Sequence, residues 1–350
     1  MTEGGQTPFS GCFEKDKRRD IQSIRLFAAF IIFVWHYWGL PIIGFVSIFF
    51  LLSGYLISQG LMRQIDSYAG HIQKKAFVIH VAYRILGPMF VLALALFPLI
   101  IMFAPDQVIY EEALRYLISL VGFSNLNLAL ENNVIFLRYY MPSIGHEWTI
   151  GVQLQAYIFM LVIFAIAGFV SVKKNTRRPL LMTVVVTGSL SLMISGYHVL
   201  SFYLSDLPNL NVQLHYSNTF SRFYQFMIGA LIALIIPEIG SFGKNHHSCI
   251  KWVQLLGVTL IPGSFWFKNT FSSPVSPAIP DLMLVSGCGL LICSGIMTKA
   301  TDSQPNVFGR FLEGRLIGLL GGYTYSLYLV HWPILVLATM YFWPPTWQFG

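Results

Sequence analysis

The chain has 350 residues, of which 55% are hydrophobic and only 11% are charged, and its mean hydropathy is +0.63. Soluble globular domains carry about a quarter charged residues, and disordered chains are poor in apolar residues, so the composition excludes both classes. The formal net charge of +7 comes from short basic clusters between long apolar runs, a pattern typical of cytoplasmic loops in membrane proteins. We therefore expect an integral membrane protein with membrane lipids as neighbours and no nucleic-acid partner.

Apolar segments follow one another along almost the whole chain. A crossing needs about 20 mostly apolar residues, and helices satisfy their own backbone in lipid. The sequence thus predicts an all-α polytopic transmembrane helix bundle of about nine to ten spans. The predicted spans are residues 22–40, 42–61, 77–103, 148–171, 180–204, 220–239, 252–267, 281–298 and 316–342, with a weaker candidate at 113–130.

The predicted organisation is one membrane domain with short ends. Residues 1–20 form a cytoplasmic N-terminal segment and residues 21–342 the transmembrane domain. Residues 343–350 are a short C-terminal end, where the truncation of a longer parent chain is left open. We expect a retained first helix in place of a cleaved signal peptide, because the run before it is polar and the apolar run is long enough to span.

The charge bias gives a predicted orientation. The basic clusters at residues 15–19 and 63–75 place the N-terminus in the cytoplasm, whereas residues 104–112 suit the opposite side. The basic cluster at residues 173–178 is cytoplasmic only if the weak segment does not cross. Charge counting therefore favours nine crossings over ten.

The first predicted span contains two ionisable residues, Arg25 and His36. Eleven positions at about 100° each bring both side chains to one helical face, roughly 16 Å apart along the axis. Taken singly, Arg25 can snorkel to the headgroups and His36 can belong to an interfacial aromatic belt. Taken together, they favour a cavity with a cation for anionic groups and an imidazole that can accept a proton.

The next two spans each offer a candidate. Ser53 and Gly54 interrupt a bulky helix, either to support the cavity or simply to allow close helix packing. Arg84 either snorkels or points inward to a phosphate-bearing ligand, for which the planar guanidinium is well suited.

His146, Glu147 and Trp148 stand just before the fourth full span. His146 and Glu147 can act as acid and base at the mouth of an outer cavity. The alternative is that both are interfacial residues beside a tryptophan anchor.

The last predicted span carries Tyr325, Ser326 and His331, with Pro333 after the histidine. An intramembrane histidine is costly in contact with lipid, so His331 is expected to face the bundle interior as a ligand-facing or a packing residue.

Familiar catalytic signatures are missing from the sequence. The four cysteines show neither CxxC nor histidine-paired zinc spacing, so no metal site is expected. We find no GxSxG elbow, Walker loop or HExxH motif. Any chemistry must therefore come from the polar residues within the membrane.

In order, these segments resemble the acyltransferase type 3 family of membrane proteins, which O-acylate sugars, peptidoglycan and lipids. The resemblance runs from about Asp20 to Leu337. Its motifs are the arginine and histidine of the first span separated by ten residues, the FFxLSGxLI segment at 49–57, Trp-Thr-Ile at 148–150, and the run Tyr-Ser-Leu-Tyr-Leu-Val-His-Trp-Pro at 325–333. The chain departs from the family pattern in several places: Ser47 replaces an aspartate, Val81 replaces one of two paired arginines, Pro88 is one residue late, and Gln153 with Leu154 replaces acidic residues.

The resemblance implies an enzyme, an integral membrane O-acyltransferase. It would move an acyl group, most simply acetyl, from acyl-CoA as co-substrate to a hydroxyl of a carbohydrate or lipid acceptor. His36 and Arg25 would be catalytic, with His36 as general base, while Arg84 and Arg25 would bind the donor phosphates. Ser53, Gly54, Glu147, Trp148, Tyr325, Ser326 and His331 would line or support the cavity.

Two other readings of the same polar cavity remain open. A transporter would show substrate flux without acyl-CoA, although the internal repeat of many transporter folds is not visible here. A non-catalytic scaffold would keep its function in a His36→Ala variant.

Overall fold

The structure is a computed structural model, and it describes residues 18–38, 44–103, 106–130, 142–204, 216–270, 278–301 and 307–342. Within these ranges the secondary structure is helical and contains no strand, which confirms the predicted all-α polytopic class. Residues 1–17 of the predicted N-terminal segment and the C-terminal end 343–350 lie outside the described residues, as do residues 131–141 and 205–215.

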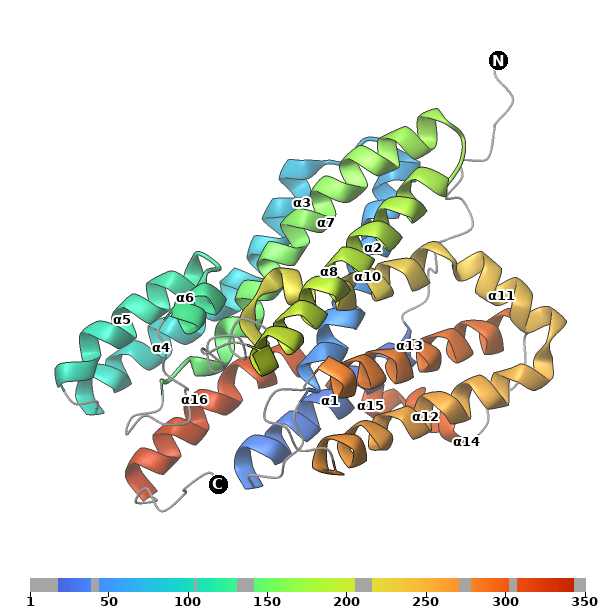
Figure 1. The fold of residues 1–350 in the computed structure, drawn as a ribbon. Helices are drawn as coiled ribbons and strands as arrows, with labels where there is room; N and C mark the ends of the chain where they lie inside the picture. The colour runs from blue at the N-terminus through green and yellow to red at the C-terminus, as the bar shows by residue number, and fades with distance from the viewer. Residues whose placement is uncertain are drawn as a thin grey trace.

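The helices run almost without interruption along the chain (Figure 1). Their bounds are α1 Arg19–Trp38, α2 Val46–Ser67, α3 Lys74–Val81, the π-helical turn η1 Ala82–Leu86, α4 Gly87–Phe103, α5 Asp106–Leu120, α6 Ser124–Leu130, the 3₁₀ turn η3 Gly145–Glu147, α7 Trp148–Lys173, α8 Arg178–Leu204, α10 Thr219–Leu234, α11 Ile236–Asn245, α12 His247–Thr270, α13 Ala278–Ala300, α14 Val307–Leu312, α15 Arg315–Gly321 and α16 Thr324–Phe342.

Within the described ranges, six helices are long and apolar enough to cross a membrane. Three other predicted spans are not among the six: α10 and α11 are bent by 60° at their junction, α16 contributes only the shorter apolar stretch Thr324–Ala338, and α12 His247–Thr270, the predicted span at 252–267, does not reach the measure. The six are Arg19–Trp38, Val46–Ser67, Lys74–Leu99, Gly145–Lys173, Arg178–Ser201 and Ile279–Ala300.

The weak candidate at 113–130 is not one continuous helix. α5 ends at Leu120, and Gly122 then adopts a φ of +80°, a left-handed conformation that glycine takes without a steric penalty. The chain resumes as α6, which packs against α7. A single crossing helix through this segment is therefore excluded.

α2 lies at the centre of the bundle, and 67% of its apolar stretch is buried, against 22% for the stretch in α8. It packs against α1, α7, α10 and α13. Its contact with α10 is very close, because a Cβ added to Gly54 would lie 2.1 Å from the carbonyl oxygen of Phe226. Gly54 is therefore a packing glycine, the second of the two roles considered for it.

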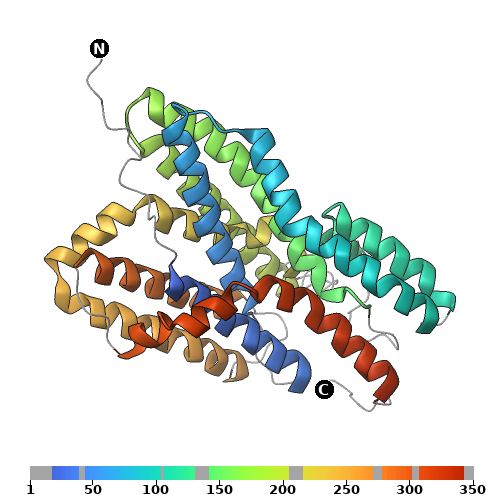
Figure 2. The same cartoon turned by 180° about the vertical axis from the view of Figure 1, so that it is seen from behind.

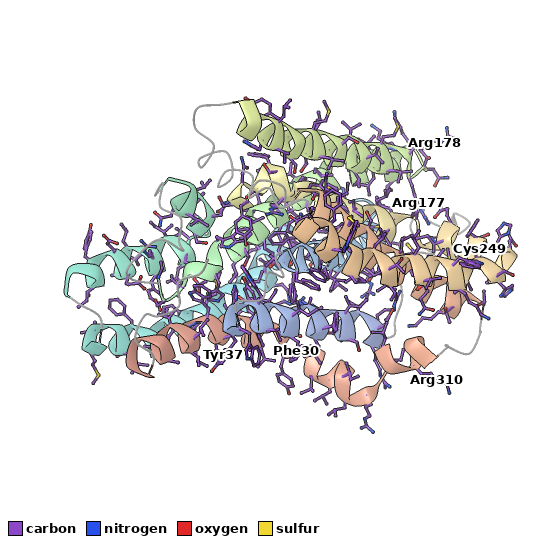
Figure 3. All side chains as sticks on the ribbon, turned by 60° about the horizontal axis from the view of Figure 1, so that its bottom comes forward. Phe30, Tyr37, Arg177, Arg178, Cys249 and Arg310 are labelled. Atoms are coloured by element: carbon purple, nitrogen blue, oxygen red, sulfur yellow. The ribbon has the colours of Figure 1, made fainter. Side chains whose placement is uncertain are left out.

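Helices distant in sequence meet beside this centre. α16 runs beside α1 and also contacts α4 (Figure 2). On α1, Phe30 and Tyr37 point outward and are exposed, which turns the Arg25 and His36 face toward the other helices (Figure 3).

Candidate active site

Two intramembrane histidines meet where the last turn of α1 passes the middle of α16. The Nδ1 atom of His36 lies 2.9 Å from the Nε2 atom of His331, within hydrogen-bond distance. Their rings are nearly parallel, with centroids 5.2 Å apart and an interplanar angle of 12°. The sequence singled out both residues separately, and the structure brings them together.

The other ring nitrogen of His331 is held by its own helix. His331 Nδ1 lies 2.5 Å from the carbonyl oxygen of Tyr328, one turn earlier. Two residues later, Pro333 has no N–H, so the carbonyl of Leu329 loses the donor that a regular helix would supply. This stretch of α16 therefore turns backbone acceptors as well as an imidazole toward the site.

A third histidine, His146 of η3, packs against His331. Its ring centroid is 5.2 Å from that of His331, and it is almost fully buried. Neither ring nitrogen of His146 makes a hydrogen bond to the described residues. No three His, Cys, Asp or Glu side chains in the described ranges are arranged to hold a metal ion.

The turn that carries His146 is fastened to α16 by hydrogen bonds. The Tyr328 hydroxyl is 2.7 Å from Thr149 Oγ1 and donates to the His146 carbonyl at 3.1 Å. One turn further along α16, Trp332 Nε1 donates to the Pro142 carbonyl at 2.8 Å. The same tryptophan presents its ring edge-on to His36, with centroids 4.8 Å apart.

Glu147 lies in the bundle interior and not at an exposed cavity mouth. Its carboxylate accepts a hydrogen bond from Ser119 Oγ, and its carbonyl accepts one from Ser124 Oγ at 2.8 Å. It is close enough to Tyr325 and Tyr328 for their charges to interact. Glu147 therefore joins α5 and α6 to the polar face of α16.

The arginines form a second group, away from the histidines. Arg25 is near enough to Arg84 and to the Tyr157 hydroxyl for their charges to interact, and its Nε atom is buried without a hydrogen bond. Arg84 lies in η1, a π-helical turn of a kind often found at functional sites. Tyr325 donates to the Ile85 carbonyl at 2.8 Å and so ties α16 to this turn.

Trp148 lies between two cavities. The centroid of its ring lies 4.4 Å from that of Tyr216 and 6.5 Å from that of Phe50. One, the aromatic cavity, has five aromatic residues among its ten lining residues; the other is more polar. The first is lined by Ile32, Trp35, Gly44, Phe45, Val46, Ser47, Phe50, Trp148, Tyr216 and Arg222, and the second by Arg115, Ser124, Asn127, Leu128, Ile144, Gly145 and Trp148.

Ser53 and Ser326, the two remaining predicted residues, differ in their relation to the site. Ser53 accepts a hydrogen bond from Gln153 Nε2 at 3.1 Å, and Gln153 also donates to the Tyr157 hydroxyl at 2.5 Å. Ser326 is exposed, because its position on α16 is roughly opposite the face that carries Tyr325, Tyr328 and Trp332. The structure therefore joins Ser53 to the arginine side of the site and does not bring Ser326 to it.

The sequence reasoning missed a buried ion pair beside the aromatic cavity. Arg222 of α10 bonds to Asp281 of α13, donates to the Tyr216 carbonyl at 3.0 Å, and lies 5.2 Å from the centre of the Tyr216 ring. Burial raises the pKa of Tyr216 to about 12, so its hydroxyl stays neutral. Both charged residues lie inside predicted spans, so the sequence could have marked each of them as a buried charge. Their pairing could not be predicted, because it joins positions 59 apart on different helices.

A second missed pair holds the start of α1. Arg18 is paired with Asp20 at 2.5 Å, and both side chains are buried. Arg18 also reaches the carbonyl of Ile292 in α13 at 3.3 Å. From the sequence, Arg18 is interpreted only as part of the basic cluster at residues 15–19 that sets the orientation in the membrane.

The acyltransferase domain family matches residues 18–350. The protein named "Putative membrane-bound transacylase BcsY" of Komagataeibacter xylinus is 24% identical over 93% of this chain and 75% of its own length. "Putative peptidoglycan O-acetyltransferase YrhL" of Bacillus subtilis is 21% identical over 91% of this chain, and "Putative O-acetyltransferase SACOL0978" of Staphylococcus aureus is 22% identical over 85%. The chain spans about half the length of these last two relatives, and no solved structure matches it.

Proposed function

Because this chain belongs to the acyltransferase domain family, we propose that it is a membrane O-acetyltransferase whose donor is acetyl-CoA and whose acceptor is a carbohydrate hydroxyl. The observation that carries the proposal is the contact between His36 and His331 beside an aromatic cavity, with a separate pair of arginines in the same bundle. The resemblance to O-acetyltransferases supports acetyl as the group transferred.

The arginine pair supports binding of the donor. In the described residues, neither Arg25 nor Arg84 forms a salt bridge, and two like charges held near each other are stabilised by an anion. The phosphates of acyl-CoA carry such charge, and guanidinium groups bind phosphate through paired hydrogen bonds. We assign the donor phosphates to this end of the site.

We assign the role of general base in the chemical step to His36. It takes the proton of the acceptor hydroxyl while that oxygen attacks the thioester carbonyl carbon. The new C–O bond forms, the C–S bond breaks, and the leaving thiolate takes the proton back from His36. The base is regenerated and no further reactant is needed.

The aromatic cavity supports a carbohydrate ring as acceptor. Ligand sites are mostly apolar with a few placed polar groups, and this cavity combines Trp35, Trp148 and Tyr216 with the buried Arg222. Trp35 packs on His36 with ring centroids 4.3 Å apart, which puts the cavity wall next to the base. The name of the Bacillus subtilis relative, a peptidoglycan O-acetyltransferase, also favours carbohydrate over lipid.

The two ends of α1 suggest transfer across the membrane. Arg25 is near the start of the helix and His36 near its end, roughly 16 Å further on, about half the hydrocarbon thickness. With the predicted cytoplasmic N-terminus, acetyl-CoA would bind from the cytoplasm and the hydroxyl would react on the outer side.

The test is acetyl transfer by purified protein in liposomes. Radiolabelled acetyl-CoA is supplied with a mixed pool of glycans and lipids, and wild type is compared with His36→Ala and Arg25→Ala. His198→Ala is the matched control, because His198 is a half-buried membrane histidine outside the described site contacts. We expect labelled glycan from wild type and from the control, and a loss of about 10²- to 10⁴-fold in His36→Ala.

Other outcomes point elsewhere. Labelled lipid in place of glycan would overturn the acceptor class. Uptake of a substrate without acetyl-CoA would favour a transporter, and full activity of folded His36→Ala would remove the proposed base.

A further inference from the structure

We propose that His331 is a positioning residue, which holds His36 in the tautomer that carries its proton on Nδ1 and leaves Nε2 free to act as the base. The inference deepens the proposed function and rests on it for its catalytic consequence. The arrangement of hydrogen bonds is a separate claim that can be tested without any substrate.

The first step is the protonation of His331. Its Nδ1 atom lies 2.5 Å from the Tyr328 carbonyl oxygen, which can only accept a hydrogen bond. Nδ1 of His331 must therefore carry a proton. In a neutral imidazole the other nitrogen is then an acceptor, so Nε2 of His331 presents a lone pair.

The second step transfers this constraint to His36. Nδ1 of His36 faces that lone pair at 2.9 Å, and one of the two nitrogens must supply the proton of the bond. Since Nε2 of His331 is the acceptor, Nδ1 of His36 is the donor. A neutral His36 consequently has no proton on Nε2.

The third step concerns the moment of proton transfer. When Nε2 of His36 takes the hydroxyl proton, the ring becomes cationic, and its Nδ1–H still donates to His331. A partner that accepts from the far nitrogen stabilises the imidazolium and keeps the ring oriented, the role that a carboxylate has in a serine protease triad. Here a neutral imidazole and a backbone carbonyl together fill that role.

The surroundings explain why His331 can be held accurately. Trp332 is fixed to the Pro142 carbonyl, and Tyr328 is fixed to Thr149 and to the His146 carbonyl. These bonds anchor the α16 turn that carries His331 on both sides. Residues in η3 and α7 therefore set the position of a side chain that acts on α1.

The experiment combines nitrogen NMR with kinetics on the full-length protein in lipid. Histidine is labelled with ¹⁵N, and the His36 signals are identified by their absence in His36→Ala. In wild type we expect His36 to have a protonated Nδ1 and a bare Nε2. In His331→Phe, which keeps a ring but has no acceptor, the bare-Nε2 form should no longer be the sole neutral form.

Kinetics supply the second readout. His331→Phe should lower kcat by about 10²-fold with unchanged KM for acetyl-CoA and acceptor, because orientation and not binding is lost. His331→Gln, which returns an acceptor oxygen near the place of Nε2, should recover most of that loss. His198→Phe is the matched control and should leave kcat unchanged.

The outcomes separate the two proposals. A proton on Nε2 of His36 in wild type, or an unchanged kcat in folded His331→Phe, overturns the positioning role even if acetyl transfer is observed. The expected tautomer in a protein that transfers no acetyl group supports the hydrogen-bond relay and overturns the proposed function. If His331→Phe does not fold, the wild-type tautomer and the His331→Gln kinetics still decide the question.

Discussion

Tyr325, Tyr328 and His331 follow one another at intervals of three residues on α16, which places them along one side of the helix. Tyr325 is bonded at the arginine end, and His331 is bonded to His36, about 9 Å further along the axis. Glu147 is close to both tyrosines between the two ends. Single side chains thus divide the site into an anion-binding end and a proton-transfer end.

This division predicts separate kinetic effects. Arg84→Ala should raise the KM for acetyl-CoA about tenfold or more and leave kcat within a few-fold, because a charged hydrogen bond to the donor is worth about 1.5–3 kcal/mol. Arg178→Ala is the control, since Arg178 is an exposed arginine at the first position of α8. Steady-state kinetics at varied acetyl-CoA make the measurement, and a fall in kcat with constant KM would contradict the assignment.

Glu112 of α5 offers a prediction about pH. Burial raises the pKa of its carboxyl group above the ordinary value, although bonds from the Ser143 N–H and hydroxyl and the nearby Arg115 act in the opposite direction. A folded-state pKa above the unfolded one means that the protonated group favours folding. This contribution is fully present below the unfolded pKa and is lost as pH rises through the folded one.

Glu112→Gln should therefore remove part of the pH dependence of stability. Relative to wild type, the variant should gain in free energy of unfolding between acid and neutral pH, while the amide keeps a hydrogen bond to Ser143. Denaturant titrations in detergent at several pH values measure this difference. A Glu112→Gln variant that loses stability relative to wild type over the same range would show the opposite sign, and Glu111→Gln, at the exposed neighbour on α5, is the control.

At the scale of elements, the crossing of α2 and α10 depends on two glycines. A Cβ on Gly54 would lie 2.1 Å from the Phe226 carbonyl oxygen, and one on Gly229 would lie 2.1 Å from the Leu51 carbonyl oxygen. Both obstacles are backbone atoms, which cannot rotate away as side chains do. The two helices must therefore move apart to admit even a methyl group.

Gly54→Ala should destabilise the protein by about 1–3 kcal/mol, the usual cost of overpacking, and reduce activity because Ser53 and the core shift with α2. Gly60→Ala is a matched control on the same helix, since no atom lies within 4 Å of its added Cβ. There alanine should be neutral or stabilise the helix by up to about 1 kcal/mol. Equal unfolding midpoints for the two variants would show that the crossing tolerates the extra atom.

The elements also show how far sequence reasoning reaches. The shared face of Arg25 and His36 followed from helical periodicity alone, and hydropathy located most of the long helices. The break at Gly122 depends on a single φ angle within a segment of weak hydropathy, so the segment stayed ambiguous. Periodicity also leaves unknown which helices touch, and the His36 and His331 contact joins residues 295 positions apart.

At the scale of the whole molecule, basic residues gather at one end. Arg177, Arg178 and Arg310 lie toward the same end of the bundle in Figure 3, together with Cys249, and Tyr37 lies away from it. Arg177 and Arg178 lie where α8 begins and Arg310 lies in α14, so two separate parts of the chain agree and this is not a local sequence effect. Because Lys and Arg accumulate in cytoplasmic loops, we predict that this end is cytoplasmic, with the start of α1 on the same side.

Cysteine labelling in oriented vesicles tests this orientation. In a background without native cysteines, Arg178→Cys should react with a membrane-impermeant maleimide only from the cytoplasmic side, and Tyr110→Cys, exposed near the start of α5, should react only from the other. Reaction of both from one side would require a different number of crossings between them. Reversal of both would place Arg25 and Arg84 outside, where acetyl-CoA is not available, and so would contradict the proposed direction of acetyl transfer as well as the topology.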